Sequence, residues 1–78
     1  MIEVFSNPFS SNISIERIET FENYSIEIFD IIGNSVYQND HHNNNSRFTI
    51  NLKNLERGIY FLNFRNGINA LTKKIVKL

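Results

Sequence analysis

Short runs in which apolar and polar residues alternate recur along most of this chain, and they restrict its fold more than any other feature does. Successive side chains of a strand point to opposite faces, so each run can bury one face and expose the other. The apolar sets are Tyr24, Ile26 and Ile28; Phe48, Ile50 and Leu52; and Tyr60, Leu62 and Phe64. The run 59–64 is apolar on its second face as well, except at Asn63. This predicts a central strand that is covered by the core on one side and partly covered on the other, and that is the best buried of the domain.

The segment 13–22 fits two kinds of secondary structure. Its first isoleucines alternate as in a strand, whereas the polar residues before it could cap a helix with Ile15, Ile18 and Glu22 on related faces. We favour a strand, because the neighbouring runs are strands and an isolated helix of about ten residues is marginal. The chain as a whole is predicted to be all-β, a small antiparallel β-sandwich of about seven strands with an immunoglobulin-like or Greek-key arrangement.

Two dipeptides containing glycine mark the expected hairpins. Asn66-Gly67 is the stronger signal, because both central residues of a type I′ turn need positive φ, and Asn and Gly tolerate it best. It is expected to join strand 59–65 to strand 68–76. Gly33-Asn34 is compatible with a type II′ turn that folds the following residues back onto 26–31.

The polar stretch 39–46, N-D-H-H-N-N-N-S, contains no apolar residue and is predicted to be an exposed loop. Its two histidines raise the question of a metal site. Adjacent side chains of an extended segment point in opposite directions, and Asp40 is the only carboxylate near His41 and His42. We therefore expect no metal site.

Length and composition indicate a single domain, 1–78, that is stabilised by packing alone. The chain has 78 residues and no cysteine, so it has neither disulfides nor thiolate metal ligands. No run reaches the roughly 18 to 20 apolar residues of a membrane span, and the first residues lack the basic head and long apolar stretch of a signal peptide. There is also no Ser/His/acid spacing of a known type and no glycine-rich phosphate loop. We expect no enzyme, no cofactor and no membrane span.

The net charge of zero conceals two oppositely charged halves. Residues 1–39 hold one basic and six acidic side chains, and residues 40–78 hold seven basic and two acidic ones. Acidic and basic strands that lie side by side would explain this, since cross-strand ion pairs help to set register. A basic terminus that contacts an acidic partner would explain it too. Nucleic acid is not expected as that partner, because the basic residues form no stripe.

Leu52, Leu55, Gly58 and Tyr60 form a unit that folding alone could explain. Two leucines three residues apart can close the end of a sandwich where the chain crosses between sheets. Gly58 permits a backbone angle closed to other residues, and Tyr60 can bury its ring while its hydroxyl reaches a partner near the rim.

Three lysines crowd the last run of the sequence, at positions 73, 74 and 77. One explanation for Lys73, Lys74 and Lys77 is protection of an edge strand, because lysines there discourage other chains from pairing with it. The other is recognition by a partner. Lys73 and Lys77 are four residues apart and should point to one face of a strand.

Two further pairs are assigned to turns. Asn7-Pro8 is expected to turn the chain after the first strand, with Pro fixing φ and Asn accepting a local bond. Asp30 with Gly33 is expected to form a turn in which the carboxylate caps backbone amides.

These motifs, taken in order, resemble a known family. The set comprises S-N-P-F at 6–9, I-F-D-I-I-G-N at 28–34, L-x-x-L-x-x-G-x-Y at 52–60, Asn66-Gly67 and the ending T-K-K-I-V-K-L. It resembles the C-terminal sorting domain of proteins exported by the type IX secretion system of Bacteroidota. Lys73 and Lys77 match the K-x-x-x-K pattern of that family's basic terminal strand, whereas Ser6 replaces the first proline of its P-N-P turn.

The resemblance implies a sorting domain at the end of a larger exported precursor, with the cargo covalently linked on its N-terminal side. Such a domain folds in the periplasm and is recognised by the outer-membrane type IX translocon. A sortase-like protease then usually removes it, and the cargo reaches the cell surface or is released. A monomer is expected.

Domains with two other functions share this architecture. Fold does not decide function, so both remain alternatives. One is an immunoglobulin-like or carbohydrate-binding accessory module, which exposed aromatics among Phe5, Phe9, Phe21 and Phe29 would favour. The other is a small adhesion or assembly domain that uses a free strand edge and would associate with rising concentration.

Overall fold

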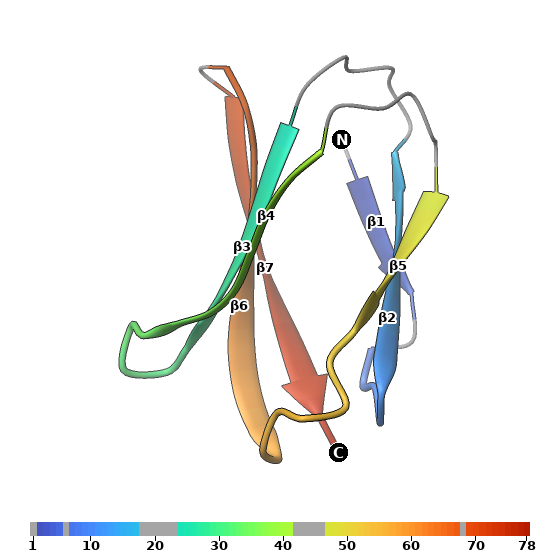
Figure 1. Ribbon diagram of the computed structural model, residues 1–78, viewed down its shortest axis with the longest axis vertical. Helices are drawn as coiled ribbons and strands as arrows, with labels where there is room; N and C mark the ends of the chain where they lie inside the picture. Colours follow the sequence, from blue (N-terminus) through green and yellow to red (C-terminus); the bar gives the residue numbers. More distant parts are fainter. Residues whose placement is uncertain (1, 6, 18–23, 42–46, 68) are drawn as a thin grey trace.

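The computed structural model describes residues 2–5, 7–17, 24–41, 47–67 and 69–78. These residues form two antiparallel sheets that face each other as the layers of a sandwich (Figure 1). In chain order the strands are β1 (Ile2–Phe5), β2 (Asn12–Arg17), β3 (Tyr24–Asp30), β4 (Ser35–His41), β5 (Arg47–Asn51), β6 (Gly58–Asn66) and β7 (Asn69–Lys77). The predicted all-β sandwich is therefore confirmed.

The small sheet has the order β1-β2-β5 and the large sheet the order β4-β3-β6-β7. Consecutive hairpins β3–β4 and β6–β7 both belong to the large sheet, while β5 returns to the small one. The last strand, β7, consequently lies at one edge of the large sheet, and β4 lies at the other.

The core lies between the sheets and takes alternate residues from both. Its buried side chains are Phe9, Ile13, Ile15, Tyr24, Ile26, Ile28, Ile50, Leu52, Tyr60, Leu62, Phe64 and Ile75. Each large apolar side chain that is buried stabilises the fold by about 1.5–3 kcal/mol relative to an exposed one. Within this core, toward the end of the sheet where β3 begins, the rings of Tyr24 and Phe64 stack with their centroids 5.3 Å apart.

Strand β6 is central, as predicted, but it is not the best-buried strand. It alternates buried residues with Ile59 and Phe61, which are 41% and 37% exposed. Strand β3 alternates buried with half-buried residues up to Phe29, and none of its residues is exposed. The partly covered second face expected from the sequence is therefore present, but the ranking of β6 as the best-buried strand was wrong, because its outer side chains remain more exposed than those of β3.

The strand interpretation of 13–22 is confirmed for 13–17, which lie in β2. Residues 18–22 lie outside the described part of the chain. The predicted loop 39–46 begins later than expected, because β4 continues through the polar residues 39–41, which pair with β3. An edge strand needs no second apolar face, so polar residues are acceptable there. Residues 42–46, including His42, again lie outside the described residues.

The β6–β7 hairpin is present, but its turn lies one residue later than predicted. Asn66 pairs with Asn69 at the end of the ladder, so Asn66 is the last strand residue rather than the first turn residue. Gly67 then occupies the first position of the turn with a φ of 58°. Glycine is suited to that position, because residues with a side chain rarely adopt a positive φ.

The β3–β4 hairpin also differs from the predicted type II′ turn at Gly33-Asn34. The N–H of Gly33 donates to the carbonyl of Asp30 at 3.1 Å, and the N–H of Asp30 donates to the carbonyl of Asn34 at 2.9 Å. The turn is therefore a wider one centred on Ile31 and Ile32. Gly33 follows it with a φ of 95° and returns the chain to β4.

Candidate functional site

The terminal strand β7 places its lysines on two faces. Ile75 is buried in the core, so Lys73 and Lys77, which are in step with it, also lie on the inward face. Lys77 is only 9% exposed, and its Nζ donates to the carbonyl of Leu78 at 3.3 Å. Lys74 lies on the outward face and is exposed. The three lysines therefore do not form one exposed surface.

Inward lysines on an edge strand have a structural use. Their alkyl stems can cover apolar surface, while their charges oppose the approach of a further strand. Lys73 is half-buried and flanks Ile75 on one side, with Lys77 on the other. This arrangement favours the edge-protection interpretation for Lys73, whereas Lys77 is nearly buried, and it leaves Lys74 as the lysine of β7 that is open to a partner.

The outer edge of β7 is bonded to the segment 7–9. The side-chain amide of Asn7 donates to the carbonyl of Lys74 at 3.0 Å, and its Oδ1 accepts the N–H of Val76 at 3.0 Å. Phe9 follows, donating its N–H to the carbonyl of Val76 at 2.9 Å and accepting the N–H of Leu78 at 2.8 Å. We call these four hydrogen bonds the 7–9 clasp.

The clasp corrects the expectation that Asn7 makes a local bond. Its partners are 67 and 69 residues away in sequence, and the Asn7-Pro8 peptide bond is cis. Phe9 is buried, so its ring holds the clasp against the core. Nothing in a local sequence window signals so distant a pairing, and the role of Asn7 at β7 was therefore missed.

The clasp covers only the C-terminal half of the β7 edge. Val76 directs its N–H and carbonyl away from β6, so residues in step with it, such as Thr72 and Ala70, do the same. The outward backbone groups of Thr72 and Ala70 have no hydrogen-bond partner within the described residues. The open part of this edge is thus about two residues long.

The unit Leu52, Leu55, Gly58 and Tyr60 forms the corner where the chain passes from β5 to β6. The hydroxyl of Tyr60 donates to the carbonyl of Glu56 at 2.7 Å, while its ring is buried. The N–H of Leu55 donates to the carbonyl of Leu52 at 3.1 Å. A tyrosine that bonds back to the backbone a few residues upstream is typical of immunoglobulin-like corners.

Two further features of the corner have physical causes. Gly58 has a φ of 152°, which other residues rarely adopt, and an added Cβ would meet no atom within 4 Å, so the demand for glycine is conformational. Burial of the phenol, with the nearby carboxylates of Glu56 and Asp30, raises the pKa of Tyr60. Tyr60 therefore stays protonated and keeps donating to the Glu56 carbonyl.

Asp30 fastens the β3–β4 hairpin. Its Oδ1 accepts the N–H groups of Asn34 at 2.8 Å and of Ile32 at 3.1 Å, which is the capping expected from the sequence. The bond from the Asn34 backbone is the largest of the effects that lower the pKa of Asp30, and it outweighs the opposing effect of desolvation. The carboxylate is therefore charged and fully engaged.

A hollow of about 180 Å³ lies between this hairpin and the corner. It is lined by Asp30, Ile31, Glu56, Arg57, Gly58, Ile59 and Tyr60. Two of the groups that could transfer protons are already engaged, since Asp30 caps the hairpin and the Tyr60 hydroxyl is bonded to the backbone carbonyl of Glu56. The hollow offers a mixed apolar and charged surface, with Glu56 and Arg57 as its remaining charged side chains.

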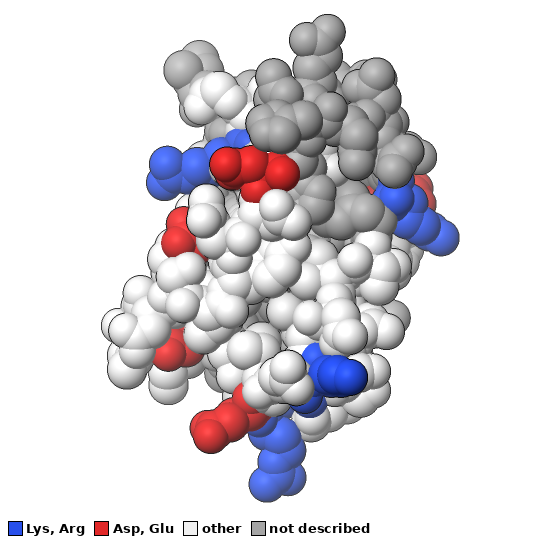
Figure 2. Space-filling view, in the orientation of Figure 1, with Lys and Arg blue, Asp and Glu red and all other residues white. Residues whose placement is uncertain are grey.

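The described residues contain no cluster of three or more His, Cys, Asp or Glu side chains that could hold a metal ion. They also contain no helix long and apolar enough to cross a membrane. Figure 2 shows acidic and basic side chains interspersed around the margin of one face of the molecule, without a continuous basic stripe.

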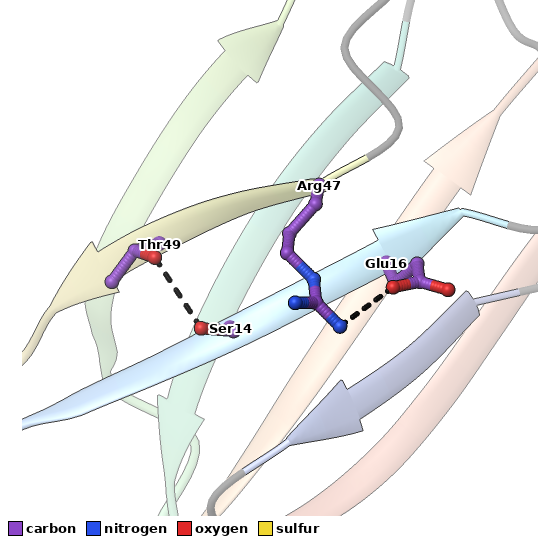
Figure 3. Close-up of polar contacts among 4 residues, drawn as sticks. All are labelled: Ser14, Glu16, Arg47 and Thr49. Carbon is purple, nitrogen blue, oxygen red and sulfur yellow. Dashed lines mark hydrogen bonds and ion pairs between the residues drawn. The ribbon is translucent and has the colours of Figure 1, made fainter.

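Oppositely charged halves of the sequence meet between β2 and β5. Glu16 of β2 and Arg47 of β5 are opposite each other, and their charged groups are 2.7 Å apart (Figure 3). Beside them, the hydroxyl oxygens of Ser14 and Thr49 are 3.3 Å apart. The side chains of Arg47 and Glu16 are 59% and 39% exposed, and solvent therefore limits the stabilisation by this pair to about 1 kcal/mol or less. Cross-strand pairing is thus confirmed for this pair.

The aromatics named for a carbohydrate-binding surface do not come together. Phe9 is buried, and Phe21 lies outside the described residues. Phe5 and Phe29 belong to different sheets, and the guanidinium of Arg47 lies 4.9 Å from the centre of the Phe5 ring. No platform forms from the described members of this set.

Comparison with known proteins agrees with this fold and its motifs. The secretion system C-terminal sorting domain family matches residues 3–78, whereas no curated protein matches the chain. A solved structure from Bacteroides vulgatus, a DUF3244-family protein with an immunoglobulin-like β-sandwich fold, is similar with a TM-score of 0.83 and 24% identity, covering 99% of this chain and 83% of that one. That likeness shows the immunoglobulin-like fold, and its source is consistent with Bacteroidota. The match over 3–78 shows that the chain belongs to the family of type IX secretion system C-terminal sorting domains.

Proposed function

We propose that this domain directs a covalently linked N-terminal cargo through the outer-membrane type IX translocon. The observation that carries the proposal is the family match over residues 3–78. The family's corner motif is also built as folding requires, with Tyr60 bonded to Glu56. Sorting signals and immunoglobulin-like domains are non-catalytic kinds of domain, and the engaged states of Asp30 and Tyr60 agree with this.

The later steps of the proposal follow from family membership. The precursor folds this domain, residues 1–78, as one unit in the periplasm, and a sortase-like protease cuts ahead of it. The cargo is then attached to the cell surface or released. Support for a single unit comes from the way β1 to β7 share one core.

A reporter fusion tests the main step. Residues 1–78 are joined to the C-terminal side of a periplasmic reporter in a bacterium with a type IX system, and reporter activity outside the cells is measured. Extracellular reporter that disappears in a translocon-deficient strain is the expected result. Retention of the fusion in the periplasm, with the domain shown to be folded, would contradict the proposal.

The lysines of β7 can be tested separately with the double substitution Lys73→Ala/Lys77→Ala. Edge protection predicts export like the parent and stronger self-association at high concentration, measured by analytical ultracentrifugation. Recognition predicts lower export without self-association. Lys53→Ala, at an exposed corner position, is the matched control. Because Lys73 and Lys77 face inward, we expect the outcome that edge protection predicts, which is export like the parent together with stronger self-association.

A further inference from the structure

The outer side of the large sheet carries a contiguous apolar area that the core does not use. Ile59 and Phe61 are 41% and 37% exposed although they belong to the central strand β6. Phe61 lies opposite the half-buried Phe29 of β3, and Ile59 lies opposite the half-buried Val76 of β7. We call these four residues the outer apolar face.

This face continues toward the β3–β4 hairpin. Ile59 and Ile31 line the same hollow, and Ile31 is 70% exposed. The next residue, Ile32, is 79% exposed at the tip of the turn. Exposed apolar side chains that occur singly are ordinary, but a contiguous set is typical of an interaction site.

The small sheet is built differently on its own outer side. Its outward positions are polar except for Phe5, and they include Glu3, Ser14, Glu16, Arg47 and Thr49. Phe5 is 36% exposed, and the Arg47 guanidinium lies over its ring. The apolar character of the large sheet is therefore a local property and not a general feature of this small domain.

Charges beside the outer apolar face restrict what can bind there. Lys74 lies directly opposite Phe61 on the edge strand β7, and Arg65 lies further along β6; both are exposed. Among the described outward positions of β6 and β7 there is no acidic side chain, and Glu27 of β3 is on the other side of the face. A complementary partner would have an apolar centre and a carboxylate placed against Lys74.

Such a surface suits a protein better than a sugar. Sugar sites combine a stacking ring with polar side chains directed at the hydroxyl groups, whereas here aliphatic Ile59 and Val76 adjoin the rings. Protein contacts typically bury a few apolar or aromatic side chains at their centre, with charges at the rim.

We propose that the outer apolar face, with Lys74 at its border, docks onto a protein component of the secretion machinery whose contact surface is apolar and carries a carboxylate opposite Lys74. This rests on the proposed function. It also assigns recognition to the outward side of β6 and β7 rather than to the inward lysines.

The test uses the reporter fused to residues 1–78 and two pairs of matched variants. Phe61→Thr is compared with Phe5→Thr, because the two phenylalanines are 37% and 36% exposed on opposite sheets. Lys74→Glu is compared with Lys53→Glu, both at exposed positions. Threonine keeps strand propensity, and circular dichroism melting of each purified variant checks that it is folded.

We expect Phe61→Thr and Lys74→Glu each to lower the extracellular fraction by about tenfold or more, as loss of a central contact does. Phe5→Thr and Lys53→Glu should export like the parent. Lys74→Glu removes no core contact, so it remains informative if Phe61→Thr is unstable.

Different outcomes separate the two proposals. If the parent fusion is not exported, the proposed function fails and this inference fails with it. If the parent is exported and folded Phe61→Thr and Lys74→Glu are exported equally well, only the docking surface is wrong. Dimerisation of the parent that Phe61→Thr abolishes would assign the face to a second copy, and NMR shifts of Phe61 with soluble oligosaccharides would assign it to a sugar; either would overturn the inference.

Discussion

The two faces of strand β6 differ in what surrounds them. On the inward face Tyr60, Leu62 and Phe64 are buried, whereas on the outward face Ile59 and Phe61 remain partly exposed. The inward residues and the corner before them are explained by folding. The motif that identifies the family in sequence is thus explained by folding. It need not be the surface that a partner contacts.

Replacing Tyr60 tests the inward face and should have the largest effect. Tyr60→Ala leaves a cavity and removes the bond to the Glu56 carbonyl, so the free energy of unfolding should fall by about 3–5 kcal/mol. Urea denaturation followed by circular dichroism measures it. Phe61→Ala is the control on the same strand, with an expected loss of about 1 kcal/mol or less. Equal losses would remove the difference between the faces.

Gly58→Ala examines the corner that leads into β6. A side chain at a φ of 152° strains the backbone, so the free energy of unfolding should fall by about 1–3 kcal/mol even though space is available. The comparison is Gly67→Asn, where a φ of 58° is tolerated by asparagine, and the loss should be smaller. Thermal melts of both variants measure the two losses of stability. A larger loss for Gly67→Asn than for Gly58→Ala would contradict the assignment of the greater backbone strain to position 58.

Asn7→Ala tests the outer edge of β7, the strand that pairs with β6. It removes two hydrogen bonds of the clasp, and the free energy of unfolding should fall by about 1–2 kcal/mol. Hydrogen exchange measured by NMR should become faster at the Val76 amide, while the exposed Asn54→Ala should leave it unchanged. A Val76 amide that stays protected in Asn7→Ala would show that the side chain does not hold this edge.

Asp30 should produce the smallest effect, and a pH-dependent one. Because its pKa is lower in the folded chain, the carboxylate stabilises the fold above about pH 4, the pKa of an unfolded aspartate, and this stabilisation is lost as pH falls through the folded value. The melting temperature of Asp30→Asn should be below that of the parent at neutral pH and should approach it in acid. A constant difference across pH would mean that the charge is not responsible.

Much of the fold could be predicted from sequence because its causes are local. The spacing of two between buried residues is visible in any short window, as at Tyr24, Ile26 and Ile28. The corner was also predictable, because Gly58 and Tyr60 are only two residues apart and both belong to the same turn of the chain.

The rest depends on which strands become neighbours. In the ending T-K-K-I-V-K-L, either Lys73, Ile75 and Lys77 or Lys74 and Val76 could face inward, and pairing with β6 decides. The turn at Gly67 was misplaced by one residue for the same reason, since the ladder sets where the strand ends. The partners of Asn7 belong to the opposite end of the sequence, and a local pattern does not reveal them.

The clasp also makes completion of the fold depend on contacts between the first and the last described strands' neighbourhoods, residues 7–9 and 74–78. Asn7 lies 67 residues before Lys74 and 69 residues before Val76, the two residues that it binds. Contacts so far apart in sequence form late and only in a chain that contains both ends. Loss of β7 would therefore also leave Asn7 and Phe9 without these partners, although both residues are remote from β7 in sequence.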